Sequence, residues 1–480
     1  MDTIRSYNSV FMVKMFLFWK LGKNIRILCC IILCTLIFAG CDHSPVEVQK
    51  SDQTEQPQQE SVLTQISKAI RKGNGKRLKK ILEDHPDLVK IKTKKNETLL
   101  HLAAEYMPDG EILAWLIEQG CDIEAKTKNL DTPLFYAAKN SQSGPIKFLL
   151  SENADIQAHN RRHEMALHYA ARYSTAEIID ILLEQGLRQY ESSYREGIFI
   201  MTPLTTALRW NPNPEIIERL VKEMPGGYRN LQILYAARYC PNPQCLQILL
   251  NYGADPNEGS MLKPLHLAAG ANPNPEIAKC LVENGADVNP YQDLVLTGGK
   301  RMPNSPLHRA ARYNSNIEVS KYLVEQGADF EQKNSHGLTP CDYAIQYSSD
   351  LRIVRYYAEL YASKHPECDP SLITLCAAAE RPTEPEVIED LVKQVSDING
   401  FWKGQSPLYY ALRFSRRSHW SYDHKNCEAI VKILLENGAN PDKVSERNTN
   451  VIDVLDEEGR NFLIDVIEKY RKPIDESTEK

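Results

Sequence analysis

The sequence lacks the short motifs that carry chemistry in common enzyme classes. It has no G-x-S-x-G, no H-E-x-x-H and no complete phosphate-binding loop. Gly73-Asn74-Gly75-Lys76 lacks both the spaced first glycine and the following Ser or Thr of that loop. No two cysteines form a CxxC pair, so a zinc ribbon and a thioredoxin-like motif are also absent. These absences argue against an enzyme, and we expect no metal and no cofactor.

The chain also lacks an apolar run of the roughly twenty residues that a membrane-spanning helix needs. Its continuous apolar run, Ile27 to Ala39, has thirteen residues and follows Lys14, Lys20, Lys23 and Arg26. A basic region, a short apolar core and then small residues are the layout of a secretory signal. Residues 1–40 are therefore predicted to be a signal peptide, with an uncleaved signal anchor in the inner membrane as the alternative.

The end of this run, Phe38-Ala39-Gly40-Cys41, resembles the lipobox of bacterial lipoproteins, with Phe38 where Leu is usual. The resemblance implies lipidation of Cys41 and export to a membrane that faces the periplasm or the cell surface. Residues 42–61 are polar and rich in Gln, Glu, Ser and Pro, so 41–61 should form a disordered tether. Residues 471–480 are expected to be a disordered tail.

Acidic residues outnumber basic ones beyond the N-terminal segment. The net charge of the chain is −6, and residues 1–41 carry five Lys or Arg against one Asp, so the remainder has a charge of −6 − 4 = −10. An acidic body argues against nucleic acid as the main partner. The hydrophobic content of 42% and charged content of 25% are ordinary for a folded soluble protein.

Proline is present in a repeated pattern. The stretch Asn211-Pro212-Asn213-Pro214-Glu215 has a partial copy at 241–244 and a full copy at 272–276. Asn accepts a hydrogen bond from a free helical N–H, Pro is tolerated at the first helical position, and Glu complements the helix dipole. Each copy therefore predicts a loop between two short antiparallel helices, and the loop recurs because the helix pair recurs.

The helix pairs repeat with a period of about 33 residues. Copies of the first helix include Leu100-His101-Leu102-Ala103-Ala104, Leu167-His168-Tyr169-Ala170-Ala171, Pro264-Leu265-His266-Leu267-Ala268-Ala269 and Pro306-Leu307-His308-Arg309-Ala310-Ala311. The second helix ends in Gly-Ala-Asp or close to it, as at 253–255, 285–287 and 327–329. The period and the T-P-L-H-x-A core resemble the ankyrin repeat family.

The resemblance implies an all-α solenoid of helix-turn-helix pairs with β-turn or hairpin connections, of about ten to twelve repeats, over residues 62–470 with caps. It also implies a non-catalytic module, expected to be a monomer, that binds another protein through its concave helical face and hairpin tips. The alternative is a structural envelope spacer without a specific client. Three insertions interrupt the period, at 187–200, 290–304 and 415–425, and are expected to be surface loops.

An arginine and an aromatic residue follow the paired alanines at the end of several first helices. The pairs are Arg172-Tyr173, Arg209-Trp210, Arg238-Tyr239, Arg312-Tyr313 and Arg413-Phe414. Equivalent positions in a solenoid align along one face, so the pairs are either consensus structure or a recruited binding stripe. Trp420 and Tyr422, beside Arg416 and Arg417 in the last insertion, also have the composition of an interface hot spot.

Histidine and cysteine offer alternative sites. The recurring His101, His168, His266 and His308 lie in different repeats, which favours a structural role over a metal site. The residues His419, Asp423, His424 and Cys427 are close in sequence but lack regular ligand spacing, so a solvated loop is favoured there.

Three cysteines, Cys121, Cys341 and Cys376, occupy expected core positions, where a thiol acts as a small hydrophobe. Most of the eight cysteines beyond Cys41 are expected to stay unpaired, and Cys240 and Cys245 are the only local candidates for a disulfide.

Overall fold

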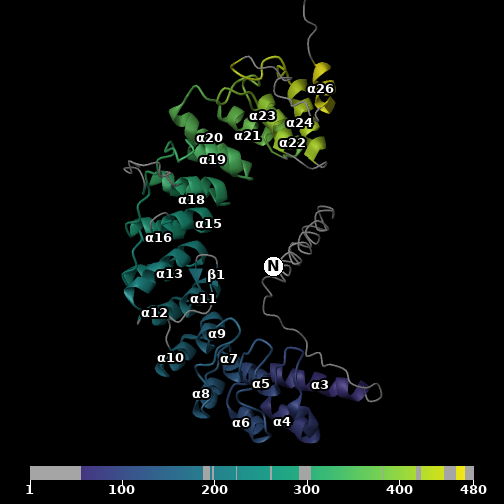
Figure 1. Cartoon of the computed structure of the whole chain (residues 1–480), viewed down its shortest axis with the longest axis vertical. Coiled ribbons are helices and arrows are strands. Elements are labelled where there is room, and N and C mark those ends of the chain that lie inside the picture. The colour runs from purple at the N-terminus through teal and green to yellow at the C-terminus, as the bar shows by residue number, and fades with distance from the viewer. Residues whose placement is uncertain are drawn as a thin grey trace, which may run out of the picture. The chain divides into compact units, whose positions relative to one another are not determined.

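A computed structural model describes residues 56–187, 195–196, 199–222, 224–259, 262–290, 304–381, 383–417, 423–447 and 461–470. These residues form two compact units, one ending at Pro133 and the other beginning at Leu134. The described residues contain eleven consecutive helix pairs, α3 to α24, followed by a single helix, α26 (Figure 1). The expectation of an all-α solenoid of about ten to twelve repeats is confirmed.

The first unit contains two helix pairs. Its elements are α3 (Gln56–Arg71), α4 (Gly75–Asp84), η1 (Pro86–Lys90), α5 (Leu99–Tyr106) and α6 (Glu111–Glu118). Helix α3 begins at Gln56, inside the stretch 41–61 that the sequence predicts to be a tether. The Asn74 side chain caps α4 by accepting a hydrogen bond from the Arg77 amide. The first pair thus forms the N-terminal cap expected around Ile66–Leu82.

The second unit holds the remaining helices and one short hairpin. Its first half consists of α7 (Pro133–Ala137), α8 (Gly144–Ser151), α9 (Ala166–Tyr173), α10 (Ala176–Glu184), β1 (Arg195–Glu196), β2 (Phe199–Ile200), α11 (Pro203–Trp210), α12 (Pro214–Lys222), α13 (Gly226–Tyr239) and α14 (Pro243–Asn251). Its second half consists of α15 (Pro264–Ala271), α16 (Pro275–Glu283), α17 (Pro306–Tyr313), α18 (Ile317–Glu325), α19 (Pro340–Tyr347), α20 (Leu351–Lys364), α21 (Pro370–Ala379), α22 (Pro385–Val392), α23 (Pro407–Arg417), α24 (Asp423–Glu436) and α26 (Asn461–Glu468).

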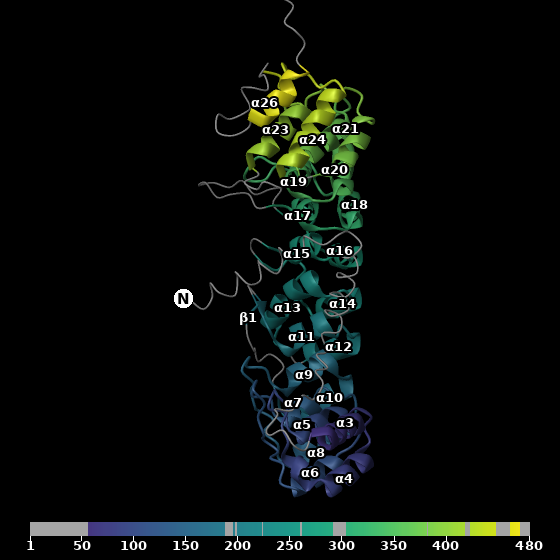
Figure 2. The same cartoon turned by 90° about the vertical axis from the view of Figure 1, so that its right-hand side faces the viewer.

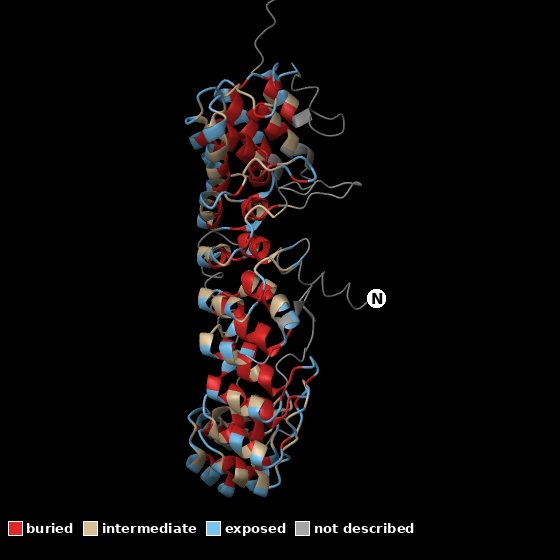
Figure 3. Cartoon of the chain, turned by 90° about the vertical axis from the view of Figure 1, so that its left-hand side faces the viewer, coloured by how far each residue is buried: buried red, intermediate tan, exposed pale blue. Residues whose placement is uncertain are grey.

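Within the second unit the helices stack in two parallel rows. Figure 2 shows α9, α11, α13, α15, α17 and α19 in one row and α10, α12, α14, α16 and α18 in the other. The first row is the more deeply buried, as Figure 3 shows. Close stacking in that row depends on small side chains: Ala170, Ala236, Ala268 and Ala310 are all almost completely buried. Because each repeat packs only on its neighbours, stability is shared among the contacts between adjacent repeats.

The repeated proline loops behave as the sequence predicts. Helices α12, α14 and α16 each begin at the proline that follows an asparagine, and the asparagine Oδ1 accepts a hydrogen bond from the second helical amide. The donors are the amides of Glu215, Gln244 and Glu276, at 3.0, 3.0 and 3.1 Å. Several second helices, including α14, α16 and α18, are followed by a glycine such as Gly253, whose φ of 86° lies in the left-handed region.

The same cap asparagines also join neighbouring repeats. The Nδ2 of Asn242 donates to the carbonyl of Pro212, that of Asn274 to Pro241, and that of Asn316 to Pro273. Each side chain therefore caps its own helix with its oxygen and bonds the preceding loop with its nitrogen. The loop recurs because it satisfies backbone groups within a repeat and between two repeats.

Two of the sequence predictions need correction. The stretch 415–425 was expected to be a loop, but α23 continues to Arg417 and α24 begins at Asp423, so both of its ends are helical. Cys121 was expected to face the core, but it is only half-buried. Its position follows the end of α6, where one side of the thiol remains open to solvent.

Candidate functional site

The recurring histidines are structural. In the first unit, His101 Nδ1 lies 2.8 Å from the Thr98 hydroxyl, and its Nε2 lies 3.1 Å from the Asp131 carbonyl. In the second unit, His308 makes the same contacts with Ser305 Oγ and the carbonyl of Leu338, at 2.7 and 2.9 Å. Each ring therefore connects the start of its own helix to the next hairpin. His168 and His266 are also buried, in keeping with a structural role for the recurring histidines.

Burial keeps these rings neutral. It lowers the pKa of His168 to about 3, that of His266 to about 3 and that of His308 to about 4. Within the described part of the chain, no group of three His, Cys, Asp or Glu side chains could hold a metal ion. The histidines are thus parts of the repeat core rather than ligands.

The cysteines are likewise part of the packing. All eight in the described residues are free thiols, and Cys240, Cys245, Cys280, Cys341, Cys376 and Cys427 are buried. The Cys245 thiol lies 3.2 Å from the carbonyl of Pro212, in the preceding loop. Burial raises the pKa of Cys280 to about 11, so this thiol stays protonated and unreactive at neutral pH.

The arginines and aromatic residues form a connected row along the first row of helices, which we call the arginine–aromatic ladder. Its members are Arg172, Tyr173, Arg209, Trp210, Arg238, Tyr239, Arg312 and Tyr313. The guanidinium of Arg172 lies 5.6 Å from the Trp210 ring centroid. Arg209 lies 4.8 Å from the rings of both Trp210 and Tyr239. The ladder therefore crosses by cation–π contacts from α9 to α11 and from α11 to α13.

Three of the four ladder aromatics are exposed to solvent despite these contacts, and Tyr239 is half-buried. Trp210 is 54% exposed, Tyr313 53% and Tyr173 44%. Large aromatic side chains exposed in a row on one face are uncommon in a surface without a partner, and they mark interaction sites. The exposure separates the ladder from the alanines directly before it, which are buried between the helices.

The ladder extends further than the sequence predicted. The Arg312 guanidinium lies 4.8 Å from the ring of Tyr313 and 4.1 Å from that of Tyr347, at the end of α19. Tyr347 is 45% exposed. It occupies the same position in its helix as Tyr313, but Gln346 precedes it in place of an arginine, so the sequence pattern of paired residues missed it.

One repeat interrupts the ladder. At the end of α15, Gly270 and Ala271 stand where the other repeats have an arginine and an aromatic residue. The Arg309 side chain from α17 lies over Gly270, and a Cβ at Gly270 would be 3.1 Å from Arg309 Nε. Arg309 Nε also donates to the carbonyl of His266 at 3.0 Å. Arg309 thus supplies the guanidinium that α15 lacks, a role that the break at Gly270-Ala271 could have indicated.

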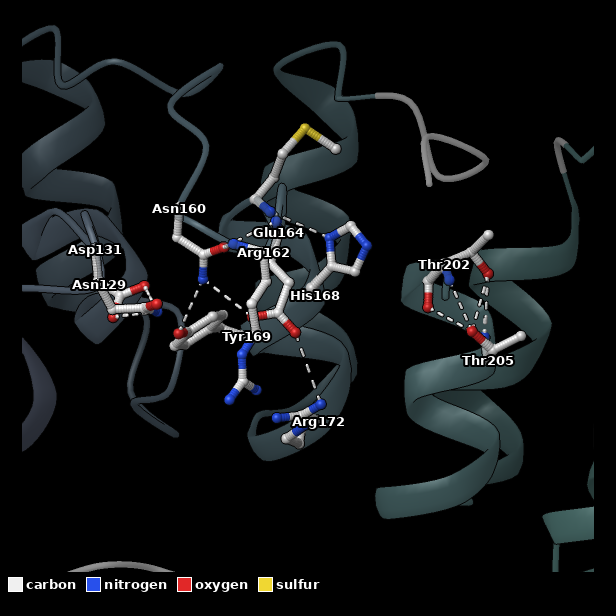
Figure 4. Close-up of polar contacts among 11 residues, drawn as sticks. Asn129, Asp131, Asn160, Arg162, Glu164, His168, Tyr169, Arg172, Thr202 and Thr205 are labelled. Carbon is white, nitrogen blue, oxygen red and sulfur yellow. Dashed lines mark hydrogen bonds and ion pairs between the residues drawn. The ribbon is translucent and has the colours of Figure 1, made fainter. Parts of the chain in front are cut away.

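The two ends of the ladder contain carboxylates. At the start, Arg172 lies 3.8 Å from the buried Glu164, whose other carboxylate oxygen accepts a hydrogen bond from Asn160 (Figure 4). Towards the end, Glu380, which directly follows α21, occupies the arginine position and lies 3.5 Å from Arg413. The cationic stretch is therefore bounded by acidic side chains on both sides.

Some candidate residues lie outside the described part of the chain. These are Cys41, Trp420 and Tyr422, together with most of the insertions at 187–200 and 290–304. The side chain of Phe414 is also not described. No helix among the described residues combines the length and the apolar character needed to cross a membrane.

Comparison with protein families agrees with this architecture. The family model Ankyrin repeats (3 copies) matches residues 66–160, 143–228, 233–334 and 265–367, and the model Ankyrin repeat matches residues 403–446. Together these matches cover well over half of the chain. The chain belongs to the ankyrin repeat family. No curated protein matches it. Ankyrin repeats indicate a protein-interaction module, and members of the family are generally not catalysts.

Proposed function

We propose that this ankyrin-repeat protein binds a client protein through the face that carries the arginine–aromatic ladder, together with the hairpin tips. The proposal depends mainly on the row of half-exposed aromatic side chains Tyr173, Trp210, Tyr313 and Tyr347, which lie against guanidinium groups from the first-row helices α9, α11 and α17. Tryptophan, tyrosine and arginine carry most of the binding energy in protein interfaces. A single copy supplies the whole face, so the module is proposed to act as a monomer.

The ladder is suited to binding because its side chains are already ordered. Each exposed ring lies against a guanidinium, and each such contact is worth about 0.5–1 kcal/mol at an exposed site. The ladder side chains would therefore lose less conformational entropy when a client binds than unrestrained arginine side chains would. The spacer alternative, which needs no client, gives no reason for large aromatic side chains to be exposed in register on one face.

Loss of two ladder side chains should abolish client binding without unfolding the array. We expect the double substitution Arg209→Ala and Trp210→Ala to reduce client binding at least about tenfold, because interface energy concentrates in such residues. The check is photo-crosslinking in the organism that makes the protein, with the reactive amino acid placed at Tyr313. The far-UV helical signal and Tm of the purified variant should stay close to those of the wild type.

Two controls decide between a binding stripe and a structural one. Lys279→Ala with Lys321→Ala changes exposed residues of α16 and α18, in the other row, and should leave the crosslink intact. Ala268→Leu adds volume between α13, α15 and α17, where overpacking costs about 1–3 kcal/mol, and should lower Tm. If the ladder substitution lowers Tm as much as Ala268→Leu does, the ladder is part of the core and the proposal fails.

We also propose that the module is exported and tethered to a membrane surface through a lipidated Cys41. Support comes from the lipobox-like Phe38-Ala39-Gly40-Cys41 after a short apolar run, and from the polar stretch that follows. The tether would hold the array away from a membrane that faces the periplasm or the cell surface. The alternative is an uncleaved signal anchor in the inner membrane.

Lipidation can be tested directly. Growth with a clickable fatty-acid analogue should label the wild type, and the substitution Cys41→Ser should remove the label, because a lipobox depends on the cysteine at this position. Cys121→Ser, which also removes one thiol, is the control and should remain labelled. A wild-type protein that carries no label but still fractionates with membranes would leave the signal anchor as the explanation.

A further inference from the structure

Three guanidinium groups lie close together in the central part of the ladder. They belong to Arg238 of α13 and to Arg309 and Arg312 of α17. Arg309 fills the position left empty by Gly270, between the other two. Arg238 lies 5.1 Å from the Tyr239 ring, and Arg309 and Arg312 lie 5.4 and 4.8 Å from the Tyr313 ring. Positive charge is therefore continuous across three repeats.

In the described part of the chain, these three arginines do not pair with acidic side chains. Among the residues that the structure describes, no carboxylate lies within ion-pairing distance of any of them, and the buried Nε of Arg238 has no hydrogen-bond partner. Burial lowers the pKa of Arg309, and the charges of Arg238 and Arg312 lower it further. The guanidiniums thus repel one another in a partly desolvated setting, where an unpaired charge is costly.

The outer helices of the same repeats are different. Lys279 of α16 pairs with Glu276, and Lys321 of α18 pairs with Glu318, although all four side chains are exposed. Arg219 of α12 likewise pairs with Asp180 at 2.7 Å. Basic residues are therefore neutralised in the row where water already screens them. In the first row, where screening is weaker, Arg238, Arg309 and Arg312 pair with no carboxylate of the described residues.

We propose that the central ladder, Arg238, Arg309 and Arg312 with Tyr239, Tyr313 and Tyr347, binds an acidic segment of a partner protein. Carboxylates of that segment would pair with the three guanidiniums, and its apolar side chains would pack on the exposed tyrosine rings. The inference rests on the proposed function and names the chemistry of the client. Arginine suits this role because its planar fork binds a carboxylate through two hydrogen bonds.

The distribution of charge favours a short acidic segment over a nucleic acid. The chain beyond residue 41 carries a net charge of −10, which repels a long polyanion. Glu164 and Glu380 lie beyond the two ends of the central ladder and limit the cationic stretch to a few repeats. An acidic peptide fits between these limits, whereas nucleic-acid surfaces present basic charge over longer stretches.

Binding of defined probes to the full chain tests the proposal. The probes are fluorescein-labelled peptides made of repeated Glu-Leu-Gly, Gln-Leu-Gly or Lys-Leu-Gly units, together with labelled oligothymidylate, all followed by fluorescence anisotropy. We expect the Glu peptide to bind at least about tenfold more tightly than the Gln and Lys peptides, and to bind more weakly as salt rises.

Matched variants locate the site. Arg238→Gln with Arg312→Gln should weaken binding of the Glu peptide by about tenfold or more. Lys279→Gln with Lys321→Gln, which removes the same charge from the other row, should leave it unchanged. Gly270→Ala keeps every charge but places a methyl group against Arg309. It should weaken the Glu peptide severalfold without lowering the helical signal, which separates loss of the site from loss of the fold.

The possible failures are distinguishable. Equal binding of the Glu and Lys peptides, or an unchanged affinity in the arginine variant, overturns the acidic partner. Tighter binding of oligothymidylate with the same dependence on Arg238 and Arg312 overturns it in favour of nucleic acid. If the Tyr313 crosslink to a client persists in either case, the proposed protein-binding function stands. If no crosslink from position 313 to a client forms either, the proposed protein-binding function also fails.

Discussion

Acidification from about pH 7.5 to about pH 5 is expected to destabilise the second unit by about 6 kcal/mol, through three buried histidines. His168, His266 and His308 are each 1% exposed or less. Burial lowers their pKa from the ordinary value of 6.5 to about 3, 3 and 4. Because the folded pKa is the lower one, the unfolded chain binds protons first as the pH falls.

The direction and the size of this change in stability follow from the order in which the unfolded and folded histidines bind protons. The stability that the neutral rings contribute is fully present above pH 6.5, the unfolded value, and is lost progressively as the pH falls towards the folded pKa values. At pH 5 each unfolded histidine has gained about 2 kcal/mol of protonation free energy that the folded one lacks. This figure depends only on the folded pKa being well below 5. The sum is comparable to the whole stability of a typical domain.

Denaturant unfolding at a series of pH values measures the effect. The slope of unfolding free energy against pH should rise from about 1.5 protons near pH 6.5 to nearly three protons near pH 5. His308→Gln is the control: whatever it does to the overall stability, it should reduce that slope by about one proton. A flat profile over this window would mean that the rings already bind protons in the folded state, which contradicts their burial.

The sequence predicted the helix pairs because each signal was local. In Asn213-Pro214-Glu215 the cap, the first helical residue and the acidic first turn are consecutive, and α12 begins at Pro214 as expected. The hydrogen bonds between neighbouring repeats could not be predicted from the sequence. Asn242 bonds the carbonyl of Pro212, thirty residues earlier, and nothing in the local pattern specifies that contact. Such contacts depend on how far one repeat rotates against the next.

The candidate site shows the same limit. Paired residues such as Arg209-Trp210 were visible in the sequence as a repeated motif. Arg309 was not visible as part of this motif, because it lies three residues before Arg312, the motif position in α17. Its side chain lies over Gly270 in the preceding repeat. Tyr347 was missed because its arginine, Arg312, is in the preceding repeat. The ladder forms only when repeats stack, because many of its contacts join residues of two neighbouring repeats. The sequence of a single repeat contains only one of the two residues in each such contact.

The lengths of two helices were also predicted wrongly. The stretch 415–425 disrupted the period, and polar residues in it suggested a loop, yet α23 and α24 extend into it from both sides. An insertion in a solenoid can lengthen the helices as well as the connection between them. The sequence could not distinguish these outcomes because arginine and lysine are favourable in both.

Replacement of Asn272 by Ala should destabilise the array by about 2–4 kcal/mol, because one buried side chain joins two repeats. Asn272 is 3% exposed at the end of α15. Its Nδ2 donates to the carbonyls of Ala237 and Cys240, at 3.2 and 2.8 Å, and its Oδ1 accepts from the Asn274 amide. Alanine leaves these two carbonyls without their donor in a site that water does not reach, and removes the turn that precedes α16.

Two further substitutions separate these contributions. Asn257, in a hairpin, bonds the carbonyl of Gly285 and the amide of Asp287, but it is half-buried at the surface, so water can replace it and Asn257→Ala should cost only about 1 kcal/mol. Asn272→Asp retains the acceptor for the Asn274 amide but directs a carboxylate at two carbonyl oxygens. It should be at least as damaging as Asn272→Ala if the bonds between repeats dominate. Denaturant unfolding of the three variants decides: near-wild-type stability of Asn272→Asp would show that the asparagine acts through its own turn rather than by joining adjacent repeats.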